Sequence, residues 1–316
     1  MELWCCLDGR TQGKCLQSKC LRKALLNKRK QEDHIKTERS ILGDIRHPFI
    51  VELKYAFQNI DKLYFAMEYC SGGELFFHLQ NVGEFDEDVA KFYAAQLVLV
   101  LGHLHQHDVM YRDLKPENVL VCCDGYVKLA DFGLAKLDVI GEKDSKSFWG
   151  TPEYLAPEII NKSGYGKSID WWMLGWLIYE MIAGIPPFYF KNREKLFKAI
   201  QNNEPKYPKE LSDDWRDLIE NFLLKDPNLR LGSGMYGFQN VKDHPWFNGI
   251  CWSKLLKKQI TPPFKPILSS EVDTRYVDIE FTKLKAVDSA GKISNLSTFN
   301  SDNWTGFSYE DSKICQ

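Results

Sequence analysis

The sequence lacks a long apolar run that could cross a bilayer. Its most apolar stretch, residues 171–190, is interrupted by Glu180 and by a Pro-Pro pair at positions 186 and 187, whereas a membrane-spanning helix needs about 20 apolar residues almost free of charge. We therefore expect a buried helix followed by a turn, and no integral membrane segment. The first residues also lack the apolar core of a secretory signal. We expect a cytoplasmic protein, with the nucleus as an alternative compartment.

Cysteine spacing and net charge exclude further classes. The nine cysteines form no Cys-x-x-Cys pair, and two pairs are directly vicinal (residues 5–6 and 122–123). An odd count without such spacing argues against a zinc site or a secreted disulfide framework and favours reduced thiols. Positive and negative charges nearly cancel, with 41 Lys and Arg against 43 Asp and Glu. No nucleic-acid or anionic-membrane partner is therefore expected, and we expect a monomer.

The order of predicted elements indicates the fold class. Short strands are predicted at residues 50–53 and 63–67, and a hairpin is predicted at residues 119–121 and 127–129 around an Asp-Gly turn. Helical periodicity marks residues 20–42, 74–79, 87–105, 168–183, 193–201 and 215–224. Strands first and helices later predict an α+β chain. We expect a small sheet lobe (residues 1–67), a helical lobe (71–247) and an extended tail (248–316).

Two motifs carry chemistry suited to phosphoryl transfer. Residues 111–118 read Tyr-Arg-Asp-Leu-Lys-Pro-Glu-Asn, and Asp131 opens an Asp-Phe-Gly sequence. Such transfer needs metal ions on the phosphates, a group that orients the attacking hydroxyl, and positive charge on the transferred group. Asp113 is the candidate proton acceptor, and Lys115 the candidate cation. Asn118 and Asp131 offer the hard oxygen ligands that Mg²⁺ prefers.

In this order and spacing the two motifs resemble the catalytic and magnesium loops of protein kinases. The resemblance implies a bilobal fold, ATP and Mg²⁺ as cofactors, and protein substrates phosphorylated on Ser or Thr. It extends to residues 156–158 (Ala-Pro-Glu), with Arg230 as the partner of their glutamate, and to Asp170, the aspartate that anchors the catalytic loop. Four residues fall where the hinge and adenine pocket are expected, namely Met67, Glu68, Cys70 and Glu74.

Features outside the catalytic loops resemble the A/G/C group of serine/threonine kinases. Residues 72–79 (Gly-Gly-Glu-Leu-Phe-Phe-His-Leu) and 150–155 (Gly-Thr-Pro-Glu-Tyr-Leu) are typical of that group. In the tail, residues 304–309 (Trp-Thr-Gly-Phe-Ser-Tyr) resemble its hydrophobic motif, with Trp304 in place of phenylalanine. The resemblance implies that these aromatic side chains dock on the small lobe near the helix that carries Glu38.

The front of the sheet lobe matches the family less well. Lys19 and Glu38 have the spacing of the strand lysine that holds the ATP phosphates and its helix glutamate. Position 17, where a small apolar residue is usual, is Gln17, and the glycine-rich phosphate loop that should precede Lys19 is absent from this chain. Two alternatives stay open: a phosphate-transferring enzyme, and a pseudokinase or truncated kinase that acts as a binding or scaffold protein.

The resemblance also implies a substrate preference and regulation. Glu74, Glu117 and Glu180 match acidic positions that bind arginines upstream of the target residue in related kinases. Ser147 and Ser308 match activating phosphorylation sites, and an upstream kinase is expected to dock at the small lobe and hydrophobic motif. The cations expected to receive a phosphate on Ser147 are Arg112, Lys136 and His34.

Overall fold

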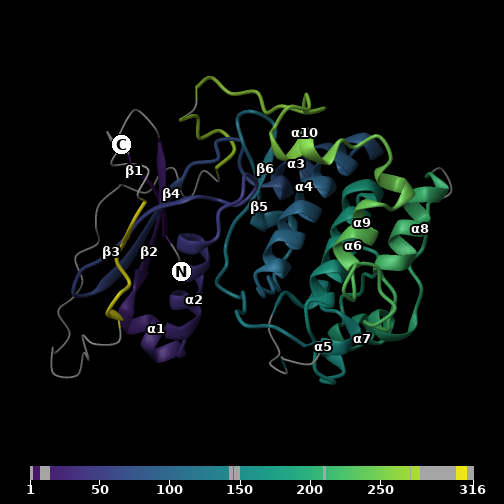
Figure 1. The fold of residues 1–316 in the computed structure, drawn as a ribbon, viewed down its shortest axis with the longest axis horizontal. Coiled ribbons are helices and arrows are strands. Elements are labelled where there is room, and N and C mark those ends of the chain that lie inside the picture. Colours follow the sequence, from purple (N-terminus) through teal and green to yellow (C-terminus); the bar gives the residue numbers. More distant parts are fainter. Residues whose placement is uncertain are drawn as a thin grey trace.

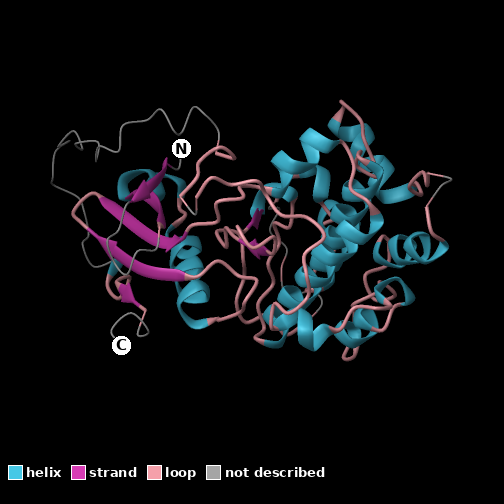
Figure 2. Ribbon diagram, turned by 90° about the horizontal axis from the view of Figure 1, so that it is seen from above, coloured by secondary structure: helices cyan, strands magenta, loops and turns pink. Residues whose placement is uncertain are grey.

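The chain folds into a small sheet lobe and a larger helical lobe, seen in this computed structural model in Figures 1 and 2. The structure describes residues 3–7, 15–141, 145, 150–208, 211–270, 272–277 and 304–311. Strands gather at one end of the molecule and most helices at the other (Figure 2). The predicted α+β fold class and its two-lobe arrangement are therefore confirmed.

The small lobe is one antiparallel sheet with strand order β1-β2-β4-β3-β7. Its strands are β1 (Leu3–Leu7), β2 (Leu16–Arg22), β3 (Leu53–Gln58), β4 (Lys62–Glu68) and β7 (Tyr309–Glu310). Helices α1 (Lys23–Arg29) and α2 (Glu32–Asp44) lie beside it (Figure 1). The last strand comes from the tail, so the tail completes the edge of the sheet next to β3.

Two predicted boundaries in this lobe are wrong. The strand expected at residues 50–53 begins only at Leu53, because Ile50 forms a bridge with Leu129 and the Val51 amide donates to the Leu129 carbonyl at 3.0 Å. The helix expected over residues 20–42 begins at Lys23, because residues 20–22 complete the ladder between β2 and β4. It is also two helices and not one, since the chain leaves the helix at Lys30 (φ 53°) and α2 begins at Glu32. In both places tertiary strand pairing overrides the local pattern.

The helical lobe is built around two long central helices. Its helices are α3 (Leu75–Val82), α4 (Glu87–Gln106), α5 (Pro157–Ile160), α6 (Ser168–Ala183), α7 (Arg193–Asn202), α8 (Asp213–Phe222), α9 (Gly237–Lys242) and α10 (Trp252–Leu256). The hairpin of β5 (Val119–Val121) and β6 (Val127–Leu129) has the predicted bounds. Among the described residues, no helix is long and apolar enough to span a membrane.

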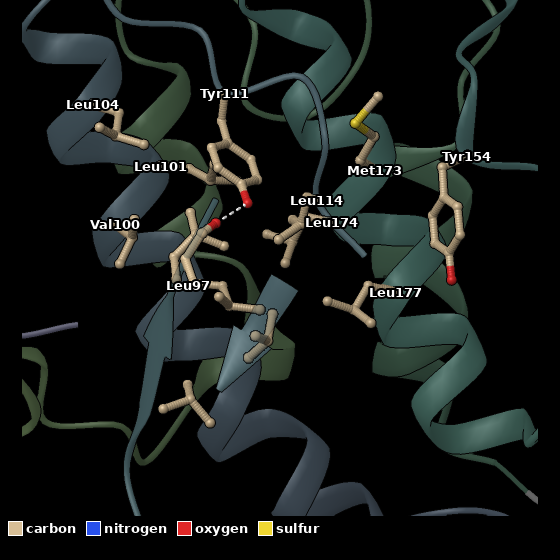
Figure 3. Packing of buried hydrophobic residues seen from close by; sticks show 14 of the residues in the cluster. Leu97, Val100, Leu101, Leu104, Tyr111, Leu114, Tyr154, Met173, Leu174 and Leu177 are labelled. Carbon is tan, nitrogen blue, oxygen red and sulfur yellow. Dashed lines mark hydrogen bonds between the residues drawn. The ribbon is translucent and has the colours of Figure 1, made fainter. Parts of the chain in front are cut away.

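Helix α6 is the apolar centre of this lobe. Leucines of α4 face Met173, Leu174 and Leu177 of α6, and Tyr111 and Leu114 lie between the two helices (Figure 3). Gly175 lets α8 approach closely, because a Cβ at that position would lie 2.4 Å from the Cβ of Phe222. The run expected to be a buried helix is therefore a helix buried on nearly all sides. Its rigidity matters because its first turn carries Asp170.

A buried ion pair joins two distant parts of the helical lobe. Arg230 donates to Glu158 of α5 through both terminal guanidinium nitrogens, Nη1 and Nη2, at 2.6 and 2.9 Å. The guanidinium also donates to the Ser168 and Leu224 carbonyls, at 3.0 and 3.1 Å. Both charged side chains are almost fully buried. The pair expected between Arg230 and the glutamate of residues 156–158 is thus formed, and it fixes α5 against the start of α6.

Replacing Arg230 should destabilise the helical lobe strongly. Arg230→Met leaves the Glu158 carboxylate buried without its partner, and breaking such a pair costs about 3–5 kcal/mol. Arg29→Met, at an exposed position in the last turn of α1, serves as the control and should change stability little. Chemical denaturation followed by circular dichroism measures both. An unfolding free energy of Arg230→Met equal to that of the control would contradict the assigned role.

Candidate active site

The carboxylate of Asp170 holds the 111–118 loop in place. It accepts the backbone amides of Tyr111 at 2.9 Å and Arg112 at 2.8 Å, and it contacts His105 Nε2 at 2.8 Å. Arg112 has a positive φ of 71°, a conformation that costs energy for a residue with a side chain. The Asp170 contact and a bond from the Arg112 guanidinium to the Ala135 carbonyl (3.2 Å) hold it there. The loop is thus preorganised by α6.

The loop brings together the three residues predicted to act in catalysis. The Asn118 amide nitrogen donates to the backbone carbonyl and to Oδ2 of Asp113, each at 2.8 Å. Lys115 Nζ lies 3.1 Å from the same Asp113 oxygen and 3.2 Å from Thr151 Oγ1. A 3₁₀ turn over Pro116–Asn118 produces this convergence, because it folds Asn118 back toward Asp113.

Burial makes Asp113 a weaker acid than usual. The loss of hydration raises the pKa of its carboxyl, and the charges and hydrogen bonds of Lys115 and Asn118 oppose that shift. A raised pKa makes the carboxylate a better proton acceptor.

Asp131 follows the β5–β6 hairpin, and its pKa is shifted in the opposite direction to that of Asp113. Burial alone would raise its pKa, but the Lys19 charge and the Gly133 amide outweigh burial and hold the pKa below its usual value. Its Oδ1 accepts from Lys19 Nζ and from the Gly133 amide, both at 3.2 Å. The next residue, Phe132, is fully buried and packs edge-on against Tyr111 at a centroid distance of 5.2 Å.

Lys19 connects the sheet lobe to this hairpin. Its ammonium donates to both oxygens of Glu38, at 2.9 and 3.1 Å, in addition to Asp131. Lys19 and Glu38 are each 1% exposed, so charges from β2 and α2 are paired out of solvent. The partners that the 19-residue spacing predicted are therefore brought into contact. Gln17, two residues earlier on β2, lies opposite Met67 in the sheet and is half-buried.

The predicted hinge residues lie at the end of β4 and in the turn after it. Glu68 Oε1 accepts the Glu52 amide at 2.7 Å and pairs with Lys128 of β6. Cys70 is buried, with its sulfur 3.7 Å from that of Cys122. The hinge is therefore joined to the catalytic hairpin by an ion pair and a sulfur contact. Sequence reasoning missed Lys128, because the middle position of a three-residue strand gives no local signal for an ion pair with Glu68.

Glu180 and Glu117 form an acidic patch, while Glu74 occupies a separate position. Tyr154 donates its hydroxyl to Glu180 at 2.6 Å. Burial first, and then the nearby Glu117 charge, raise the pKa of Glu180 against the opposing effect of the Tyr154 hydrogen bond. Glu74 is exposed at the start of α3 and bridges Leu120. The structure therefore brings together two of the three glutamates predicted to bind substrate arginines.

The structure places the three cations expected near Ser147, but Ser147 itself lies outside the described residues. Burial, followed by the Arg112 charge, lowers the pKa of His34, so α2 and the catalytic loop approach each other here. Lys136 is paired through its backbone with Met110. The role of these three residues as phosphate partners stays a prediction.

The aromatic tail residues lie on the small lobe. Trp304 and Phe307 are buried, and Phe307 packs edge-on against Phe65 at a centroid distance of 5.3 Å. Arg39 of α2 donates to the carbonyls of Phe307 and Ser308, each at 3.2 Å. The expected docking beside the helix of Glu38 is therefore present, with the Ser308 side chain exposed.

Comparison with known proteins gives consistent matches. The protein kinase domain family matches residues 6–247. Over 292 residues the chain is 44% identical to serine/threonine-protein kinase gad8 of Schizosaccharomyces pombe, covering 92% of this chain and 51% of that protein. It is 46% identical over 270 residues to RAC-beta serine/threonine-protein kinase of Homo sapiens, covering 85% and 56%. The chain thus spans about half the length of these two curated relatives.

Proposed function

The chain belongs to the protein kinase domain family, and on that premise we propose that it transfers phosphate from ATP to Ser or Thr residues of proteins. One observation carries the proposal. The Lys19 ammonium contacts Glu38 and Asp131 together, so the phosphate-holding cation and the metal-binding carboxylate are already at one point. In kinases the pair between this lysine and its helix glutamate, and the contact of the aspartate with the metal, must both be in place for transfer.

The residues present suit Mg²⁺ and ATP. The amide nitrogen of Asn118 is engaged by Asp113, which leaves the amide oxygen as its ligand atom, and the pKa of Asp131 is held low so that its carboxylate is ionised. Both are hard oxygen donors. Lys19 would hold the ATP phosphates, and the hinge of Met67, Glu68 and Cys70 would hold adenine. When bound, the metal supplies charge neutralisation on the phosphates.

Asp113 would receive the proton of the attacking hydroxyl at Oδ1 or Oδ2. Its backbone carbonyl and Oδ2 are fixed by Asn118, so the carboxylate does not have to be oriented during the reaction. Lys115, 3.1 Å from Asp113 and bonded to Thr151, would hold positive charge beside the transferred group. Such preorganised charge costs no rearrangement when the transition state forms.

The regulation that the sequence resemblance implies is part of this proposal. Ser147 and Ser308 would accept phosphate, which adds about −1.5 to −2 charge at neutral pH and needs cationic partners. Arg39, which already binds the Ser308 carbonyl, is a candidate cation for a phosphate on Ser308. An upstream kinase would dock at the small lobe, and we propose a cytoplasmic monomer.

Removing the proton acceptor should abolish most of the transfer. Asp113→Asn keeps the shape and the bond to Asn118 but cannot accept a proton, and such catalysis is worth about 10²–10⁴ in rate. Asp88→Asn, at an exposed position in the first turn of α4, is the control and should transfer phosphate as the unmodified chain does. Radiolabelled phosphate incorporation into a peptide measures the rates. If Asp113→Asn keeps its rate and its melting profile, another group accepts the proton.

The pH profile should carry the signature of Asp113. Transfer needs the ionised carboxylate, so the rate should fall as pH drops through a pKa that lies above the ordinary 3.8. The Lys115 charge lowers that pKa, so Lys115→Met should slow transfer and move the acidic limb of the profile to higher pH. Rate constants measured between pH 4 and pH 8, with folding checked at each pH, test this. If the acidic limb stays at the same pH in Lys115→Met, a group other than Asp113 causes that limb.

Substrates with Arg three residues before the target should be preferred, because Glu180 and Glu117 offer an acidic patch for a guanidinium. Glu180→Gln keeps the acceptor for Tyr154 but loses the charge, and hydrogen bonds to charged groups are worth about 1.5–3 kcal/mol, or roughly 10–100-fold. The preference for Arg should fall by that factor. Glu194→Gln, exposed on α7, is the control. A peptide screen that favours acidic or proline-directed targets would refute the assignment.

A further inference from the structure

The residue after the last strand, Asp311, is a buried carboxylate held between two cations. Its Oδ1 lies 3.0 Å from Arg46 Nη2, and its Oδ2 lies 3.1 Å from Lys54 Nζ. Its side chain is 0% exposed. Arg46 follows α2, whereas Lys54 is in β3, so one tail carboxylate contacts both elements. The Asp311 clamp denotes Asp311, Arg46 and Lys54 below.

The positive charges of Arg46 and Lys54 are balanced by Glu52 only when Asp311 is also present. Lys54 Nζ also pairs with Glu52 at 2.8 Å, and Arg46 pairs with Glu52 at 2.7 Å. Two cations therefore share two carboxylates, one of which comes from the tail. Burial alone would lower the pKa of Lys54, but the bonds to Glu52 and Asp311 outweigh burial and raise it. Without Asp311, a partly buried site would keep one uncompensated positive charge, which is unfavourable.

The backbone supports the same contact. The Asp311 amide donates to the Lys54 carbonyl at 3.0 Å, so Lys54 binds both the main chain and the side chain of Asp311. Just before it, β7 pairs with β3 in the register Tyr55 opposite Glu310 and Ala56 opposite Tyr309. A side-chain anchor at the end of a two-residue strand compensates for the few ladder bonds that so short a strand can form.

Residues in the middle of the 304–311 segment contact α2 and the residue Arg46 just after it. The carbonyls of Phe307 and Ser308 accept from Arg39, which directly follows Glu38 in α2. Tyr309 adds a second contact, because its hydroxyl accepts from Arg46 and its ring lies 5.2 Å from the Arg39 guanidinium carbon. Movement of the tail would therefore act on α2, and through Glu38 on Lys19.

We propose that Asp311 is a positioning residue that clamps the tail to β3 and to the end of α2, and so maintains the Glu38–Lys19 pair without phosphate on Ser308. The proposal rests on the proposed kinase function for its effect on activity, although the clamp itself does not. The permanent charge of Asp311 supplies an anchor that needs no modification. The Ser308 side chain is exposed, so phosphate there would add to a contact that already exists.

The test uses the full chain without phosphate on Ser308, confirmed by mass spectrometry. Hydrogen–deuterium exchange is compared for the unmodified chain and for Asp311→Asn, Asp311→Glu and Glu310→Gln. The last variant changes net charge by the same amount at the exposed neighbouring position. We expect Asp311→Asn to speed exchange in residues 304–311 by at least about tenfold, and to speed exchange in α2 as well. Glu310→Gln should retain protection, and Asp311→Glu should restore part of it.

A kinetic readout separates positioning from mere stability. In Asp311→Asn we expect kcat to fall and KM for ATP to rise by at least about threefold each, with KM for the peptide unchanged, because Lys19 is the affected group. Exchange in α6 should stay slow in every variant, which shows that the helical lobe is folded. Protection of residues 304–311 in Asp311→Asn equal to that in Glu310→Gln would overturn the clamp and leave Trp304 and Phe307 as the anchors.

The outcomes also separate the two proposals. If neither the unmodified chain nor any variant transfers phosphate, the proposed function fails. The exchange data still decide whether Asp311 holds the tail. If transfer is normal in Asp311→Asn although residues 304–311 exchange quickly, the tail is clamped as described but does not position α2, and the positioning role is refuted.

Discussion

The arrangement of this site depends on one buried ammonium group. Lys19 is 1% exposed and contacts carboxylates from two parts of the chain, Glu38 on α2 and Asp131 beyond the hairpin. A buried cation is tolerated only with such partners, so its burial requires the small lobe to remain in this position relative to the hairpin. The two ion pairs of Lys19 therefore hold the small lobe in position and also neutralise the buried charge. Loss of Lys19 would remove the cation that Glu38 and Asp131 share.

The helical lobe supplies the rigidity that this arrangement needs. Asp170 is fixed because α6 is packed on nearly all sides, and its carboxylate in turn fixes the backbone amides of the catalytic loop. The strained φ of Arg112 is maintained by these bonds. Apolar packing thus determines where Asp113 lies, although none of the packed residues takes part in the chemistry. The small lobe has fewer layers, and its position depends on ion pairs and on the docked tail.

Much of the fold and site could be predicted because the signals were local or had fixed spacing. The hairpin around Asp124-Gly125 and the 168–183 helix have the predicted bounds, since turn chemistry and apolar periodicity act within a few residues. The 50–53 strand was misplaced because its first residues pair with a hairpin 79 residues later, as Ile50 does with Leu129. Such an interaction has no local sequence pattern. The Asp311 clamp was missed for the same reason. The residue range of the tail domain stays a prediction.

Asp113 and Asp131 show how one site can keep two carboxylates in different protonation states. Asp113 is buried and Asp131 is half-buried, and burial by itself raises the pKa of each. For Asp131 the Lys19 ammonium reverses that effect, whereas for Asp113 the Lys115 charge only reduces it. Acidification should therefore protonate Asp113 while Asp131 is still ionised. The roles that we propose, a proton acceptor for Asp113 and a metal ligand for Asp131, need this difference. The difference depends on the Lys19 contact with Asp131, because a Lys19 that paired with Glu38 alone would leave burial to raise both pKa values.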